Sequence, residues 1–205
     1  TNKIEFTSNE VIGTLVLNNK AQILAQLHLF ELNQMLVSVT ISDNFEQLLE
    51  YFNTKILSQD VSINDISNLN HIDIVYNENK LVENVTKVDE TTKITINNTY
   101  CIELYSVKLS RKHCDGDRHS FNQWRVDNLL PWYNYEITSS VNPYQCGLGY
   151  QVHENKGCYT GQEILTRMRT RNKGIYRLVS QENSDSELLK PSTVGSSKSL
   201  YLQKI

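Results

Sequence analysis

One cysteine of the chain stands in a setting that favours thiol chemistry. Cys158 lies between Gly157 and Gly161 and two residues after Lys156. Glycines let the backbone turn sharply or approach a ligand closely. A neighbouring cation and a helix N-terminus both favour the thiolate, which is the nucleophilic and metal-binding form of cysteine. The segment predicts a reactive Cys158, and the alternative interpretation is a small packed residue beside a solvated lysine.

A helix is expected to follow this cysteine directly. Thr160 and Glu163 have the spacing of a capping box, which predicts a helix from Thr160 to about Arg171. The unpaired amides at its first turn are suited to a carboxylate or a phosphate. We therefore expect Cys158 to lie just before a helix end that can also hold an anion.

The octapeptide KGCYTGQE, Lys156–Glu163, with Arg167 four residues beyond it, resembles the signature of the YgfZ-type folate-binding proteins. This family supports iron–sulfur cluster assembly and is related in fold to the glycine-cleavage aminomethyltransferases (GcvT, or T-protein). Weaker likeness extends over about residues 11–177. It is carried by Asn18–Phe30, Arg125–Trp132, Asn142-Pro143 and Gly147-Leu148.

The resemblance implies an α+β fold of the GcvT/YgfZ type, with domains in a ring around a central folate pocket. It implies tetrahydrofolate as the cofactor and iron–sulfur proteins or their assembly machinery as partners. Cys158 would be the functional thiol, and Lys156 would tune it electrostatically. The family's pocket positions correspond here to Gly157, Tyr159, Gly161, Gln162, Glu163 and Arg167.

The chain departs from the aminomethyltransferases at an acidic pair in the second strand of their hairpin. The matching positions here are Ala25 and Gln26, neither of which can ionise to orient the reacting folate nitrogen. The resemblance thus favours a folate-binding accessory factor for iron–sulfur cluster assembly or repair over a classical turnover enzyme. Two alternatives stay open: a folate-dependent aminomethyl or one-carbon transferase, and a degenerate scaffold without ligand.

The domain organisation implied by the family has two parts. Residues 1–174 would form the folate-binding region. Residues 175–205 are too few for the family's C-terminal β-barrel, so we expect a truncated remnant that is partly loop. The chain is expected to be either a reduced family member or an incomplete one.

Hydrophobic periodicity predicts the elements that must position these residues. Strands are expected at residues 11–17, 23–32, 35–41, 61–66, 72–76, 101–109 and 200–205. Short strands in a solvated edge region are expected within 77–98. Helices are expected at 44–57, capped by Asp43 with Glu46, at 120–130, capped by Ser120 with Gln123, and at 160–171.

Composition narrows the function classes. The net charge of −3 argues against a general affinity for nucleic acid or membranes. No apolar run reaches the roughly 20 residues of a membrane helix. The four cysteines are widely spaced and form no CxxC pair, so we expect reduced thiols and no zinc ribbon. The expected location is the cytoplasm, or the mitochondrial matrix in a eukaryote.

Four further features have both a functional and a structural interpretation. Cys114–His119 combines metal-ligand types, but a polar turn before a helix is favoured over a metal site. The basic segment Arg167–Arg177 would attract a folate tail or end a helix favourably. The aromatic residues around Pro131 would line a pterin or pack in the core. His28, between apolar neighbours, is expected to be half-buried and satisfied.

Overall fold

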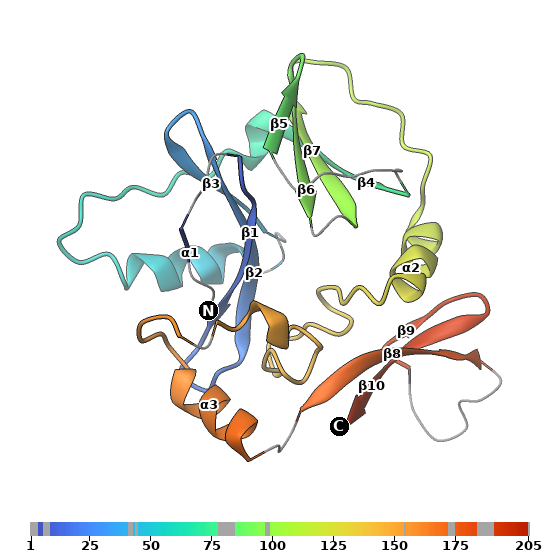
Figure 1. Ribbon diagram of the computed structural model, residues 1–205. Helices are drawn as coiled ribbons and strands as arrows, with labels where there is room; N and C mark the ends of the chain where they lie inside the picture. Colours follow the sequence, from blue (N-terminus) through green and yellow to red (C-terminus); the bar gives the residue numbers. More distant parts are fainter. Residues whose placement is uncertain are drawn as a thin grey trace. The chain divides into compact units, whose positions relative to one another are not determined.

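A computed structural model describes residues 4–5, 9–40, 43, 45–77, 85–96, 99–153, 155–171, 175–183 and 191–204. Within these ranges the chain forms three α-helices and ten strands, the strands in three small sheets (Figure 1). The mixture of helices with separate sheets confirms the predicted α+β class. No helix in these ranges is long and apolar enough to cross a lipid bilayer.

The element boundaries and the strand orders are as follows. The strands are β1 (Ile12–Leu17), β2 (Ile23–Leu32), β3 (Met35–Val39), β4 (Asn70–Tyr76), β5 (Val85–Val88), β6 (Thr91–Ile96), β7 (Tyr100–Ser106), β8 (Tyr176–Glu182), β9 (Thr193–Val194) and β10 (Lys198–Lys204). The helices are α1 (Phe45–Asn53), α2 (Arg118–Asp127) and α3 (Gln162–Thr170), with short 3-10 turns η2 (Ser67–Leu69) and η3 (Gly149–Gln151). The sheets have the orders β1-β2-β3, β4-β7-β6-β5 and β8-β10-β9.

The chain divides into two compact units. Unit 1 holds Leu15–Ala25 with Cys114–Ile205, and unit 2 holds Ile4–Thr14 with Gln26–His113. Both β1 and β2 contribute residues to each unit. The expected boundary after residue 174 adjoins 172–174, which lie outside the described residues, so the division into a folate region and a barrel remnant stays a prediction.

The core of unit 1 is built mainly from β1, β2 and the loops before α3. Alternation along β1 directs Leu15 and Leu17 to the same face, where they meet Ile23 of β2. Leu165, at 1% exposure, is the buried side chain by which α3 joins this cluster. The cluster comprises Leu15, Leu17, Ala21, Ile23, Ile137, Cys146, Leu148, Val152 and Leu165.

A fully buried ion pair lies beside this core. The guanidinium of Arg125 in α2 donates to the Glu136 carboxylate at 3.0 Å, and both side chains are 0% exposed. The remaining guanidinium N–H groups donate to the carbonyl of Leu130 and to the side chains of Asn122 and Thr193. The planar group also lies over the ring of Tyr135, 4.6 Å from its centroid. Every donor of the buried cation therefore has an acceptor.

The carboxylate is satisfied equally well. Glu136 accepts from the backbone N–H of Trp132 at 3.0 Å and from the hydroxyls of Ser192 and Thr193 at 2.6 Å each. The pair thus joins α2, the turn at residues 132–137 and β9. A buried charge that keeps all its partners is tolerated, whereas one left alone is strongly destabilising.

In unit 2, β6 and β7 form the inside of the four-stranded sheet. Ile94 and Ile96 of β6 are 0% and 3% exposed. The expected short strands within 77–98 are present as β5 and β6, and residues 78–84 and 97–98 lie outside the described ranges. The solvated-edge prediction is wrong for β6, because β5 rather than β6 occupies the edge of the sheet.

His28 of β2 departs from the expected half-buried, satisfied histidine. Only 8% of it is exposed, and burial lowers its pKa from 6.5 to about 4. Its Nε2 lies 3.4 Å from the hydroxyl of Tyr100, while its Nδ1 has no hydrogen-bond partner among the described residues. Unit 2 therefore holds a neutral imidazole in an apolar setting.

Other elements also differ from expectation. The strand predicted over residues 61–66 is wrong: this segment is irregular and exposed, without a pairing strand among the described residues. Helix α1 ends at Asn53, four residues before the predicted end, and has Leu48 as its one buried residue. The capping box of α2 is formed by Asp117 with Ser120, so this helix begins at Arg118 and not at Ser120.

Replacing Arg125 with Met should destabilise unit 1 by about 3–5 kcal/mol, because Glu136 would keep a buried charge without its cation. The two tryptophans of the chain, Trp124 and Trp132, flank this pair, so chemical denaturation followed by their fluorescence measures the loss. Arg177→Met is the matched control, since Arg177 is exposed and its guanidinium donates to the side chain of Gln203 and not to a buried carboxylate. Equal stability of the two variants would contradict the role of the pair.

The stability of unit 2 should fall as pH falls from about 6.5 towards 4. In this interval the unfolded state binds a proton at His28, whereas the buried imidazole of the native state stays neutral. The full loss is on the order of 3 kcal/mol over that interval. His28→Leu should flatten the pH dependence of denaturation, followed by circular dichroism, and His113→Leu at an exposed position should not. An unchanged slope in His28→Leu would show that this imidazole does not titrate as stated.

Candidate functional site

The predicted signature forms a loop that ends at Gly161, the N-cap of α3. Gly161 has φ +84 and makes no side-chain cap, so the predicted capping box of Thr160 with Glu163 is wrong and the helix begins at Gln162. A Cβ at Gly161 would lie 2.8 Å from the Cα of Ala21, a backbone atom that cannot move aside. Glycine is required here both for its left-handed conformation and for this close approach.

Ala21 is itself held in a left-handed conformation, with φ +61 and 0% exposure. It lies in the turn between β1 and β2, where the side chain of Asn18 accepts hydrogen bonds from the backbone N–H groups of Lys20 and Gln22. The N–H of Ala21 donates to the Asn18 carbonyl at 3.0 Å. The turn is therefore a rigid platform, and the signature loop is fixed against it at Gly161.

Cys158 is a free, exposed thiol on this loop. No hydrogen bond or ion pair joins it to another predicted site residue in the described part of the chain. Cys146, twelve residues before Cys158 in the sequence, is completely buried. Burial raises the pKa of its thiol to about 12. Its Sγ lies 3.6 Å from the Asn142 carbonyl oxygen. Cys146 is thus a core residue, whereas Cys158, like Cys114, is exposed at the surface.

Lys156 and Tyr159 are brought together beside the cysteine. The Lys156 Nζ lies 5.5 Å from the centre of the Tyr159 ring, and partial burial lowers the lysine pKa. Burial also raises the pKa of Tyr159, which packs with Tyr144 against the core cluster. A cation over an aromatic face is a favourable arrangement that also presents a flat surface beside a positive charge.

The other predicted residues are placed less specifically. Glu163 and Arg167 form an exposed i,i+4 ion pair at 2.7 Å, with side-chain exposures of 83% and 58%. Such pairs contribute only about 0.3–0.5 kcal/mol. A Cβ at Gly157 would meet open space, so the structure does not require glycine at this position. Gln162 is half-buried in the first turn of α3.

The positions that match the aminomethyltransferase acidic pair lie on β2. Ala25 is 1% exposed, and Gln26 is half-buried. The disfavoured transfer chemistry, which was inferred from these two residue types, stays a prediction.

Cys114–His119 has structural roles. Asp117 caps α2 by accepting from the Ser120 N–H at 2.8 Å, and His119 already belongs to the helix. No group of three or more His, Cys, Asp or Glu side chains suited to a metal ion occurs among the described residues. Residues 114–117 are irregular and exposed and lead into α2, to which Arg118 and His119 belong, so the predicted turn is wrong for these last two residues.

The aromatic residues around Pro131 pack mainly with one another. Trp124 is 6% exposed and stacks on Phe121, and Trp132 contacts the same ring edge-on. Tyr135 receives the Arg125 guanidinium on its face. These contacts favour the core interpretation over a pterin wall.

Two cavities are lined by described residues and contain no predicted site residue in their walls. One, of about 390 Å³, lies in unit 1 between Tyr144, Tyr150 and Tyr176, and the other lies in unit 2. Residue types and spacing singled out Cys158, but they missed the structural roles of Ala21, Arg125 and Glu136. Ala21 follows an Asn-Asn-Lys turn, which was a usable signal, whereas Arg125 and Glu136 show no pattern that marks them as buried partners.

No protein-family model matches the chain, and no curated protein matches it significantly. The likeness to the YgfZ-type proteins rests on the residues quoted for it.

Gly161→Ala should destabilise unit 1 by about 2–4 kcal/mol, from the left-handed backbone conformation and the contact with Ala21. Gly157→Ala is the matched control and should change the unfolding free energy by less than about 0.5 kcal/mol. Denaturation followed by tryptophan fluorescence measures both variants. Equal effects of the two substitutions would show that the loop is not fixed at Gly161.

Proposed function

We propose that this chain is a folate-binding accessory factor for iron–sulfur cluster assembly or repair, of the GcvT/YgfZ-like fold, with Cys158 as its functional thiol. The observation that carries the proposal is the exposed Cys158 within the octapeptide Lys156–Glu163, followed by Arg167. An octapeptide with a correctly spaced arginine is far more specific than a cysteine between two glycines.

The setting of Cys158 supports a chemical role for this thiol. It is exposed, whereas Cys146 is sealed in the core with a raised pKa. The loop that carries it is fixed at Gly161 against a rigid turn. Thiolate sulfur is the ligand that iron–sulfur clusters take in proteins. An accessible cysteine on a positioned loop is suited to contact a cluster or a cluster-bearing partner.

Tetrahydrofolate is the proposed cofactor, and the signature offers groups of the appropriate types. The Tyr159 ring would contact the flat pterin, and Lys156 and Arg167 would attract the glutamate carboxylates. Gln162 and Glu163 would supply hydrogen-bonding groups, and the backbone at Gly157 and Gly161 would allow close approach. Each role is carried over from the family to the matching position in this chain.

We propose a binding and assembly role and not a one-carbon transferase. Methylene transfer needs a carboxylate near the reacting folate nitrogen, and Ala25 and Gln26 cannot provide one. The proposed partners are iron–sulfur proteins or their assembly machinery, without direct contact to nucleic acid or membrane. The proposed compartment is the cytoplasm, or the mitochondrial matrix if the source is eukaryotic.

Calorimetric titration of the reduced protein with 5-formyltetrahydrofolate should show saturable binding. Cys158→Ala should bind this folate within about twofold of the unchanged protein, because the thiol is assigned to cluster chemistry and not to folate contact. Tyr159→Ala should weaken binding by about tenfold or more through loss of the aromatic face. Absence of binding by a folded protein would contradict the folate site.

The role of the thiol is tested separately in cells whose own copy has been deleted. Cys158→Ala should fail to restore the activity of a [4Fe–4S] dehydratase, whereas Cys114→Ala, at the other exposed cysteine, should restore it fully. Full restoration by Cys158→Ala would overturn the assigned role. Equal failure of both variants would show that the effect is not specific to the signature.

A further inference from the structure

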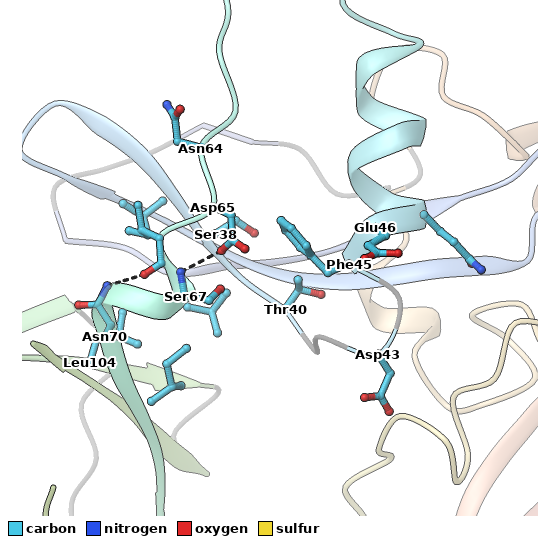
Figure 2. A pocket seen from close by; sticks show the side chains of 15 residues that line it. Ser38, Thr40, Asp43, Phe45, Glu46, Asn64, Asp65, Ser67, Asn70 and Leu104 are labelled. Carbon is cyan, nitrogen blue, oxygen red and sulfur yellow. Dashed lines mark hydrogen bonds between the residues drawn. The ribbon is translucent and has the colours of Figure 1, made fainter. Parts of the chain in front are cut away.

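Unit 2 contains a cavity of about 530 Å³ that lies away from the signature in the sequence. Its walls come from β3 and the residue after it, the first turn of α1, and the chain from residue 64 into β4 (Figure 2). The volume is within the range of ordinary ligand pockets, about 300–1,000 Å³.

The cavity runs along the edge of β3. Four consecutive residues, Val37–Thr40, line it. Successive side chains of a strand point to opposite faces, so consecutive residues share a wall only when the strand presents its edge. The strand pairs with β2 on one side and is the last strand of its sheet. Its other side therefore borders the cavity.

The register shows which backbone groups face this free edge. Asn33 and Gln34 both have positive φ, as in a two-residue type I′ hairpin turn, which makes Leu32 and Met35 a hydrogen-bonded pair. Hydrogen-bonded and non-hydrogen-bonded pairs alternate along an antiparallel ladder. Ser38, opposite Leu29, is thus in a non-hydrogen-bonded pair, and its N–H and C=O point away from β2, towards the cavity.

Among the described residues no strand pairs with this edge of β3, and the strand itself has none of the residues that usually discourage pairing. The strand reads MLVSV, without a lysine, a proline or an inward-pointing charge. Met35 and Leu36 are 60% and 62% exposed. An apolar edge with open backbone groups favours the addition of another strand.

The charge of the cavity indicates what kind of strand fits. Asp43, Glu46 and Asp65 lie around it, and no lysine, arginine or histidine lines it in the described part of the chain (Figure 2). Hydrogen bonds from the Ser67 side chain and backbone lower the pKa of Asp65, so this carboxylate is ionised at neutral pH. The apolar wall is supplied by Phe45, Ile72 and their neighbours.

We propose that the free edge of β3 binds an extended segment of a partner protein, rich in lysine or arginine, as an added strand. Main-chain hydrogen bonds to Ser38 provide affinity, as in other cases of strand addition. Alternate side chains of the segment contact the apolar wall and the carboxylates, so an alternation of apolar and basic residues is recognised. The inference does not depend on the proposed folate or cluster role.

A second copy of this chain is a poorer occupant. An isologous dimer through β3 would bring the same acidic groups of both copies to one interface, and like charges in contact are unfavourable. The chain as a whole also carries a net charge of −3. Charge complementarity therefore selects a basic partner segment.

Fluorescence anisotropy with short labelled peptides tests the proposal on the full chain. Three probes alternate valine with lysine, with glutamate or with serine, and a fourth is the lysine peptide N-methylated on alternate residues. The lysine peptide should bind, and the glutamate peptide should not. N-methylation should weaken the binding by about tenfold, because it removes the peptide donors that face β3.

Substitution at one position separates backbone from side-chain effects. Ser38→Pro removes the outward N–H without breaking a β2–β3 hydrogen bond, and should weaken the lysine peptide about tenfold. Ser38→Ala keeps the N–H and should bind within about twofold. Glu46→Gln should weaken binding by about two- to fivefold, with a smaller effect at high salt.

Each other result overturns the proposal. Equal binding of the glutamate or serine peptide would remove the charge argument, and absence of lysine-peptide binding would remove the site. Unchanged affinity after N-methylation would show that the peptide does not pair with β3, even if Ser38→Pro fails to fold. A dimer in sedimentation that Ser38→Pro abolishes would assign the edge to a second copy.

Discussion

The buried pair of Arg125 and Glu136 is the interaction on which unit 1 depends. Each charge alone would be expensive in an apolar interior, and the pair is tolerated because every guanidinium donor and both carboxylate oxygens have partners. Those partners come from α2, from the turn at residues 132–137 and from β9. The need to pair these two buried charges thereby fixes the relative positions of three segments, which the hydrophobic pattern alone does not determine.

The buried ion pair is connected to the candidate site through the hydrophobic core of unit 1. The turn that holds Glu136 also places Ile137 in the core cluster, which includes Leu165 of α3 and Ala21 of the first hairpin. Because α3 enters the core through Leu165, the position of its first turn follows from that cluster. Gly161 then fixes the signature loop against Ala21. Cys158 lies three residues before this fixed point, on the exposed part of the loop.

Local patterns predicted the elements with strong alternation and missed those that depend on distant partners. The bounds of β2, Ile23–Leu32, were predicted to the residue. The strand follows a turn that is closed by the Asn18 side chain, and its residues are largely apolar or alternate in burial. Residues 61–66 show similar alternation but have no pairing strand among the described residues, so alternation alone did not produce a strand. The caps of α2 and α3 were misplaced because several polar residues at each start have compatible spacings, and only the backbone conformation decides between them.

For the site, the sequence predicted residue types better than contacts. The octapeptide predicted a reactive cysteine near a lysine. The structure places Cys158 on the surface, with Lys156 over the ring of Tyr159, and the reactivity of the thiol stays a prediction. The octapeptide could not indicate that Gly161 and Gly157 differ, because the difference is the presence of Ala21 about 140 residues earlier, opposite one glycine only. Gly161 cannot carry a Cβ because Ala21 lies against it, whereas a Cβ at Gly157 would meet open space. The octapeptide therefore contains positions with different constraints. Gly161 is constrained by its contact with Ala21, whereas Cys158 is exposed and is open to a chemical role.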